Sequence, residues 1–263
     1  MKQELSKKTR TESDLIGSRE VPESALYGVQ TLRGIENFRI SKFHLNEYPL
    51  FIQALAITKM GAAIANRELD LLTKEQTDAI LKACKEILEG KYRDQFPVDM
   101  IQGGAGTTTN MNANEVIANR ALELMGHQRG EYQYCSPNDH VNRSQSTNDA
   151  YPTAIHIGLY YTHLKLVKHF ETLIQSFRKK GEEFANIIKM GRTQLEDAVP
   201  MTLGQTFNGF ASILEHEVKN LDFAAQDFLT VNMGATAIGT GITAEPGYAE
   251  KCIAALGKIT GLD

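Results

Sequence analysis

Uncharged hydroxyl and amide side chains gather in three short stretches of this sequence. They occupy residues 102–112, 138–149 and 191–202, and each precedes a segment whose pattern is typical of a helix. Free backbone N–H groups and the positive end of the helix dipole make a helix start a site for anions. Hydroxyl and amide donors can hold a carboxylate there without a competing cation. If the three clusters converge, they predict a site for a small, highly charged acid.

The simpler interpretation is that these residues only cap helices, since Ser, Thr and Asn are the usual N-cap residues. A cap uses one or two residues, however, whereas the second cluster is polar from Asn138 to Asp149 except at Val141. That excess favours ligand binding about as strongly as capping. The glycines between 103 and 106 form no P-loop, because no Gly-Lys-Ser/Thr follows, and their spacing is not that of a dinucleotide fingerprint.

Histidine and cysteine provide no competing chemistry. His140 lies within the second cluster, and the other histidines are scattered without metal-ligating spacing. Cys84, Cys135 and Cys252 lie far apart with no CxxC pair. An odd, dispersed set of thiols predicts a reducing, cytoplasmic location and neither a disulfide framework nor a zinc scaffold. We therefore expect no metal site.

Helical patterns surround the clusters. Residues 49–72 are largely apolar, and Thr73 with Gln76 forms a capping box for a helix that runs to about Gly90. Residues 110–125 are a further helix, closed by Gly126. Strand signals are weak, and only 38–44 and 92–100 are candidates for a small sheet.

The strongest pattern begins at Pro152. From there to about Ile188 apolar residues recur at helical spacing, which gives a helix about 55 Å long. A compact chain of this size has a radius of gyration of only about 18 Å. A second long helix covers 203–231, and a third begins near Glu245. Such helices must bury their apolar stripes against several neighbours, so other chains or further sequence must complete the bundle.

The predicted fold is therefore mainly α. It comprises an N-terminal helical domain (1–145) and the first part of a central, truncated long-helix bundle (146–263). The 263 residues carry a net charge of −4 and are 42% hydrophobic and 23% charged, which excludes disorder. The absence of a basic excess argues against nucleic acid, and no apolar run reaches the ~18 residues of a membrane span. The first fifteen residues lack the apolar region of a secretory signal.

Three long motifs resemble the aspartase/fumarase superfamily, in its order and at its spacing. They are GGAGTTTNMNANEV (103–116), PNDHVNRSQSTNDAYPT (137–153) and MGRTQLEDAVPMTLGQ (190–205). Residues 18–31 are also similar to the family's N-terminus. The sequence STNDAY from Ser146, and Val199 and Met201 around Pro200, favour the aspartase branch over fumarate hydratase. The resemblance implies the family's long-helix fold and a homotetramer whose active sites combine loops from three subunits.

The implied activity is that of a carbon–nitrogen lyase, which reversibly eliminates ammonia from L-aspartate to give fumarate without a cofactor. Carried over by position, Thr107, Ser146 and Thr147 would bind the β-carboxylate. Asn148 would hold the amino group, helped by Thr107. The hard step removes a proton beside the β-carboxylate and creates an aci-carboxylate, which aimed donors must stabilise.

The third motif implies that Thr193 contacts the α-carboxylate and that Gln194 lies near the leaving amine, although glutamine cannot act as an acid. The family's base is a serine in a GSS-x-x-P-x-K-x-N loop, and these 263 residues contain no such stretch. The base is therefore not assigned, and we expect little or no activity from this segment alone. Fumarate hydratase and a non-catalytic helical assembly module are the alternative functions.

Overall fold

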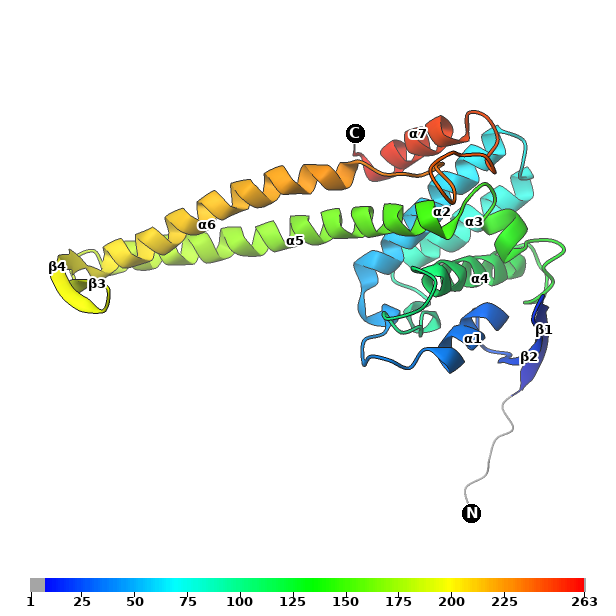
Figure 1. The fold of residues 1–263 in the computed structure, drawn as a ribbon, viewed down its shortest axis with the longest axis horizontal. Helices are drawn as coiled ribbons and strands as arrows, with labels where there is room; N and C mark the ends of the chain where they lie inside the picture. The colour runs from blue at the N-terminus through cyan, green and yellow to red at the C-terminus, as the bar shows by residue number, and fades with distance from the viewer. Residues whose placement is uncertain (1–7, 263) are drawn as a thin grey trace, which may run out of the picture. The chain divides into compact units, whose positions relative to one another are not determined.

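The computed structural model describes residues 8–262, so residues 1–7 of the N-terminal stretch discussed above and Asp263 lie outside it. By its internal contacts the chain divides into two units. The first comprises the chain up to Gly158 together with the residues from Val231 onward, and the second comprises Leu159–Thr230. Helices dominate both units (Figure 1), which confirms the mainly α prediction.

The first unit is built around two buried helices, α2 (Pro49–Glu68) and α4 (Thr107–Leu124). Helix α2 packs against α3 (Lys74–Leu88) and α7 (Tyr248–Thr260). Helix α4 packs against α3 and against α1 (Val29–Asn37). Most side chains of α2 and α4 are buried on all sides, as a central helix requires.

The predicted capping box at the start of α3 is confirmed. The Thr73 hydroxyl accepts from the Gln76 backbone N–H at 3.2 Å, and the Gln76 side-chain oxygen accepts from the Thr73 N–H at 3.1 Å. Helix α4 begins at Thr107, three residues before the predicted start. The extension is possible because Gly106 takes the N-cap position with a φ of +92°.

A close crossing of α2 and α7 depends on Gly61. A Cβ at this position would lie 2.7 Å from the Leu256 side chain. We expect Gly61→Ala to destabilise the protein by about 1–3 kcal/mol through overpacking. Urea unfolding measures this loss. Gly209→Ala is the matched control, because Gly209 is exposed in a helix with open space around it and should gain about 0.5–1 kcal/mol. Equal effects of the two substitutions would contradict the prediction.

The strands lie elsewhere than the sequence predicts. Between segments 38–44 and 92–100 the strand pairing is limited to an isolated bridge between His44 and Asp99, beside which the Asp99 carboxylate accepts from Ile40 and Ser41. The first unit instead carries an antiparallel hairpin of β1 (Thr9–Asp14) and β2 (Gly17–Pro22). Its two strands are joined by polar side chains, including Thr9 and Thr11, which both donate to Glu20. Polar cross-strand pairs leave no alternating apolar pattern, so the sequence carries no clear signal for this hairpin.

The second unit contains most of α5 (Thr147–Glu183), the hairpin of β3 (Ile188–Thr193) and β4 (Glu196–Thr202), and α6 (Leu203–Ala225). Helix α5 starts five residues earlier than predicted and ends where the chain turns toward β3. Helix α6 ends earlier than predicted, in a 3-10 turn at Gln226–Leu229. No helix among the described residues is long and apolar enough to cross a membrane.

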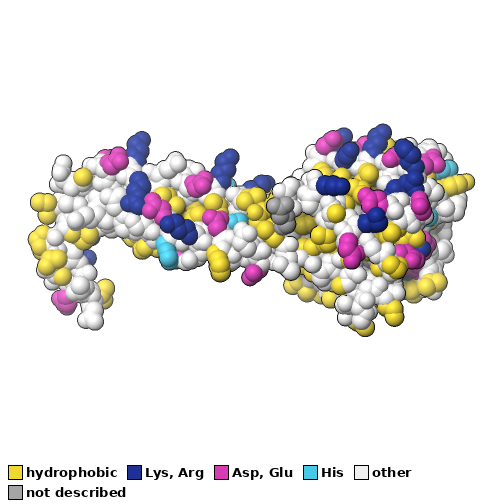
Figure 2. Space-filling view, turned by 90° about the horizontal axis from the view of Figure 1, so that it is seen from above, with side chains coloured by type: hydrophobic (Ala, Val, Ile, Leu, Met, Phe, Trp, Pro, Cys, Tyr) yellow, Lys and Arg dark blue, Asp and Glu magenta, His cyan; other side chains and the backbone are white. Residues whose placement is uncertain are grey.

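Aromatic contacts and ion pairs join α5 to α6. Phe177 packs against Phe207 and Phe210 with ring centroids 6.0 and 5.7 Å apart. Arg178 pairs with Glu215 at 2.7 Å. Within Leu159–Thr230, nevertheless, no leucine, isoleucine, valine, phenylalanine or methionine is buried. Hydrophobic side chains instead lie at the surface of these helices, among charged ones (Figure 2). The unit by itself has no hydrophobic core.

Candidate functional site

The first two polar clusters meet inside the first unit. Helix α4 begins at Thr107 and helix α5 begins at Thr147, so both clusters lie at helix starts as expected. The Asn110 side-chain amide on α4 donates to the Thr147 hydroxyl at 3.2 Å. A cleft of about 460 Å³ lies beside this junction, and among the predicted site residues Asn148 contributes to its lining. Its lining comprises Met100, Gln102, Ala105, Gly106, Asn148, Tyr151 and Pro152.

Ser146 and Thr147 present hydroxyl protons that the protein does not use. The Ser146 oxygen accepts from the Asn148 backbone N–H at 3.2 Å, and the Thr147 oxygen accepts from Asn110. Between residues 8 and 262 neither hydroxyl proton has an acceptor. A hydroxyl that already accepts can still donate its one proton. The pair is therefore suited to a carboxylate at the positive end of α5.

Thr107 and Asn148 differ from that pair because each has a donor already committed. The Thr107 hydroxyl donates to the Gly104 carbonyl at 2.6 Å, so its remaining capacity is to accept. The Asn148 amide nitrogen donates to the Ala237 carbonyl at 2.8 Å. This orientation leaves the Asn148 side-chain oxygen as an acceptor. Both residues are exposed, and their free oxygens suit an ammonium group better than a carboxylate.

Gly106 holds the two clusters at contact distance. Its φ is +92°, and a Cβ there would lie 2.5 Å from the Tyr151 ring. We expect Gly106→Ala to destabilise the protein by about 1–3 kcal/mol, because it adds both backbone strain and a clash. Thermal unfolding measures the loss, and calorimetric titration with succinate should show weaker binding. Gly90→Ala is the control, since φ is +87° there but no atom lies within 4 Å. If the two variants lose equal stability, contact with Tyr151 contributes nothing.

A distant loop is fastened to the start of α5 through a proline. Pro152 is the sixth residue of α5 and has no N–H to donate to the Asn148 carbonyl, four residues earlier. The Asn232 side-chain amide donates to that carbonyl instead, at 3.0 Å. The Asn148 carbonyl that Pro152 leaves without a helical partner is therefore the point at which the segment after Val231 binds to α5.

Asp149 fastens the same loop from inside. Its side chain is fully buried. One carboxylate oxygen accepts from the Ser146 N–H at 2.9 Å, and the other accepts from the N–H groups of Gly234 and Thr236 at 3.2 and 2.8 Å. Burial raises the pKa of Asp149, and these hydrogen bonds oppose the rise. The carboxylate fixes the backbone that carries Ser146 and Thr147.

A buried cation lies beneath the cluster. Lys59 on α2 is 1% exposed, and its ammonium donates to side-chain oxygens of Asn110, Asn142 and Gln145 at 2.7, 2.9 and 2.8 Å. Burial lowers the pKa of Lys59 to about 7, and the charge of Asp149 opposes that shift. The sequence motifs gave no role to Lys59. The available signal was a lone lysine within the apolar stretch 50–65.

The third cluster corrects the expectation that all three lie at helix starts. Thr193 ends β3 and Gln194 opens a tight turn, in which Gln194 and Leu195 have φ values of +47° and +72°. Both Thr193 and Gln194 are exposed. Thr202 alone sits at a helix start, where its hydroxyl accepts from the Gln205 N–H. Thr193 and Gln194 belong to the second unit, whereas Thr107, Ser146, Thr147 and Asn148 belong to the first.

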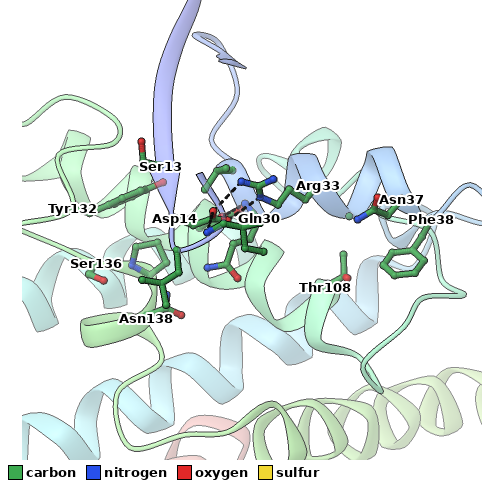
Figure 3. Close-up of a pocket in the computed structure, with 16 residues that line it drawn as sticks. Ser13, Asp14, Gln30, Arg33, Asn37, Phe38, Thr108, Tyr132, Ser136 and Asn138 are labelled. Atoms are coloured by element: carbon green, nitrogen blue, oxygen red, sulfur yellow. Dashed lines mark hydrogen bonds and ion pairs between the residues drawn. The ribbon is translucent and has the colours of Figure 1, made fainter. Parts of the chain in front are cut away.

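A larger cleft of about 680 Å³ lies beside α1 and the turn of the β1–β2 hairpin (Figure 3). The Arg33 guanidinium in this cleft donates to both carboxylate oxygens of Asp14 at 2.9 Å and also to the Gly17 carbonyl. These contacts lower the pKa of Asp14. Because the charged groups of Arg33 and Asp14 already pair with each other, this cleft offers an anion a less prepared site than the hydroxyl pair of Ser146 and Thr147 does. Among residues 8–262 no group of three or more His, Cys, Asp or Glu could hold a metal ion.

Comparisons with known proteins show the family to which the chain belongs. A family model described as lyase matches residues 17–263. The aspartate ammonia-lyase of Escherichia coli (strain K12) is 54% identical over 258 residues, 98% of this chain and 54% of the relative. The aspartate ammonia-lyase of Pseudomonas canavaninivorans is 56% identical over 253 residues, 96% of this chain and 53% of the relative.

Two solved structures have the same fold. A fumarate lyase:delta crystallin from Brucella melitensis, bound to cobalt, gives a TM-score of 0.92 at 50% identity over 97% of this chain and 55% of that one. A class II fumarase from Schistosoma mansoni gives a TM-score of 0.88 at 36% identity over 97% of this chain and 53% of that one. The chain spans about half the length of the relatives it matches. On these matches the chain belongs to the lyase family, within the aspartase/fumarase superfamily.

Proposed function

We propose that this chain forms the substrate-gripping part of an aspartate ammonia-lyase, a carbon–nitrogen lyase that converts L-aspartate to fumarate and ammonia. The observation that carries the proposal is the hydroxyl pair of Ser146 and Thr147 at the start of α5, with both protons free to donate. The aspartate ammonia-lyases that are 54–56% identical to the chain support it.

In this proposal Ser146 and Thr147 bind the β-carboxylate of the substrate. A base removes the proton from the neighbouring carbon, and the electron pair moves into the carboxylate to give an aci-carboxylate with two negative charges. The two hydroxyl protons and the positive end of α5 stabilise that charge as it forms. The intermediate then collapses to the carbon–carbon double bond of fumarate and expels the amine.

Thr107 and Asn148 bind the amino group of the substrate in the same proposal. Both present an oxygen that can accept, because each has already committed a donor to a backbone carbonyl. The resemblance alone gives Thr193 a contact to the α-carboxylate and places Gln194 near the leaving amine. The carboxyl contact assigned to Thr107 from the resemblance is the weaker part of its role, since its proton is occupied.

The test supplies L-aspartate and L-malate to the natural polypeptide that carries this sequence and follows the absorbance of fumarate. We expect turnover of L-aspartate, and Thr147→Val should lower kcat/KM by about 100-fold, as loss of an oxyanion donor does. Thr172→Val is the matched control on an exposed part of α5. Preference for L-malate would favour the fumarate hydratase alternative. Failure to bind succinate would favour a non-catalytic assembly module.

We further propose that residues 1–263 alone turn over little or no substrate, because no serine loop of the family's kind occurs among them. The assay is fumarate formation by the isolated chain. Turnover comparable to that of the natural polypeptide would place the base within these residues. Location in the cytoplasm, and the division into domains at residue 145, stay predictions.

The proposed assembly is a homotetramer with shared active sites. Its physical support is the second unit, in which exposed Leu173, Phe210, Ile213 and Phe223 lack a core to enter. Copies of the same helices are the simplest cover for such surfaces. Light scattering during gel filtration of the natural polypeptide tests the assembly, and a monomer at micromolar concentration would contradict it.

A further inference from the structure

The ammonium of Lys59 dictates which way three neighbouring amides face. An ammonium has three donors and no acceptor. Its partners at 2.7–2.9 Å are the side chains of Asn110, Asn142 and Gln145. Each of these amides must therefore turn its oxygen toward Lys59 and its nitrogen away.

The orientation of the Asn110 amide determines the direction of the Thr147 hydroxyl proton. With its oxygen on Lys59, the Asn110 amide nitrogen faces Thr147 and donates to the hydroxyl oxygen at 3.2 Å. An amide nitrogen donates and does not accept, so the Thr147 proton cannot point back at Asn110. Across residues 8–262 that proton meets no other acceptor and is left for a ligand.

We propose that Lys59 is a positioning residue that turns the Thr147 hydroxyl proton toward the substrate carboxylate, acting through the Asn110 amide. The inference deepens the proposed function and rests on it. Lys59 does not touch the substrate in this scheme, because its side chain is 1% exposed and its three protons are occupied.

The sharpest test is Asn110→Asp. A carboxylate of the same shape accepts from Lys59 with one oxygen and from the Thr147 hydroxyl with the other, at the loss of the hydrogen bond that the Asn110 amide donates to Asn142 at 3.1 Å. The Thr147 proton then turns inward, and the site loses a donor. We expect affinity for succinate, measured by calorimetric titration of the natural polypeptide, to fall about 100-fold. We expect kcat/KM for L-aspartate to fall at least as much, because charge on the β-carboxylate grows along the reaction.

A merely structural role for Lys59 predicts the opposite result. The new carboxylate gives Lys59 an ionic partner, which offsets the lost hydrogen bond to Asn142, so the site should bind succinate as before. Lys59→Met is a weaker test, because it strands three amide oxygens and can prevent folding. Asn37→Asp is the matched control, since it adds the same charge to an exposed position of the same unit. It should change succinate affinity by less than about threefold.

The double variant separates the proposed relay from simple charge repulsion. Thr147→Val removes the hydroxyl that Asn110→Asp is expected to turn. If both substitutions act on one proton, the double variant loses little more affinity than either single variant. The inference would be overturned if the losses of succinate affinity multiplied in the double variant. It would also be overturned if Asn110→Asp bound succinate as tightly as the natural polypeptide does.

Urea unfolding without ligand tests the role of Lys59 independently of the proposed function. In the Asn110→Asp background the Thr147 hydroxyl donates to a buried carboxylate, so Thr147→Val should lower the urea midpoint further than it does in the natural background. If succinate does not bind the natural polypeptide, the proposed function fails, and this comparison alone decides the role of Lys59. Equal midpoint changes in the two backgrounds would overturn it.

Discussion

Replacing Asp149 with alanine is expected to cost about 3–5 kcal/mol of stability, as removal of one side of a buried ionic network does. The substitution leaves the N–H groups of Ser146, Gly234 and Thr236 without an acceptor in a site that excludes water. The segment after Val231 would then lose its inner attachment to α5. We also expect kcat/KM to fall, because the Ser146 backbone loses its anchor.

Urea unfolding measures the stability loss. Asp78→Ala is the control, since that carboxylate is exposed and pairs only with Lys74 across one helical turn. It should cost less than about 1 kcal/mol. If Asp149→Ala unfolds at the same urea concentration as Asp78→Ala, the carboxylate does not hold the loop. Asp149→Asn should fall between the two, because an amide keeps one acceptor but turns a donor toward an N–H.

The second large effect is expected at Glu115, which caps a helix from a distance. The start of α1 has no side-chain cap of its own. The Glu115 carboxylate on α4 accepts instead from the N–H groups of Gly28, Gln30 and Thr31 and from the Thr31 hydroxyl, at 2.6–3.0 Å. Glu115→Ala leaves four donors without an acceptor, three of them buried, and should destabilise the protein by about 3–5 kcal/mol.

The pH dependence of the stability provides a second test of the role of Glu115. Burial raises the pKa of Glu115 to about 7, although its hydrogen bonds oppose the rise. Between the unfolded value, about 4.5, and about 7 the folded chain therefore holds a proton that the unfolded chain releases. The contribution of Glu115 to stability is present below the lower value and is lost as the pH rises through the upper one.

Glu115→Gln removes this titration and retains an acceptor for part of the cap. The stability difference between the natural protein and Glu115→Gln should accordingly be larger at pH 5 than at pH 8. Urea midpoints of the two proteins at both pH values measure it, and shared titrating groups cancel in the comparison. A difference that does not change with pH would contradict the raised pKa.

Helices were predictable because their signals are local. The Thr73–Gln76 box and the apolar spacing after Pro152 report directly on backbone hydrogen bonds and on the buried face. The helix starts at Thr107 and Thr147 were missed by three and five residues. The first depends on the positive φ of Gly106, and the second on Asn232 serving the carbonyl that Pro152 cannot. Neither condition can be read from neighbouring residues.

The residue types of the candidate site could be predicted from the sequence. How these residues act together was less predictable. The hydroxyls at Ser146 and Thr147 stand out in the sequence, whereas the direction that we propose for the Thr147 proton depends on Lys59, more than 80 positions earlier. The third cluster was misplaced because turn residues at positive φ and helix caps share the same polar composition. Only the strand pairing of Ile188–Thr202 distinguishes the two.

The coreless pair of long helices has a consequence for how the protein responds to dilution. The two helices contact each other through Phe177, Phe207 and Phe210, whose side chains remain partly exposed to water. In the proposed tetramer the apolar side chains of these helices are buried only by contact with neighbouring copies. Folding and assembly then become one equilibrium, so the melting temperature should climb as the protein is concentrated.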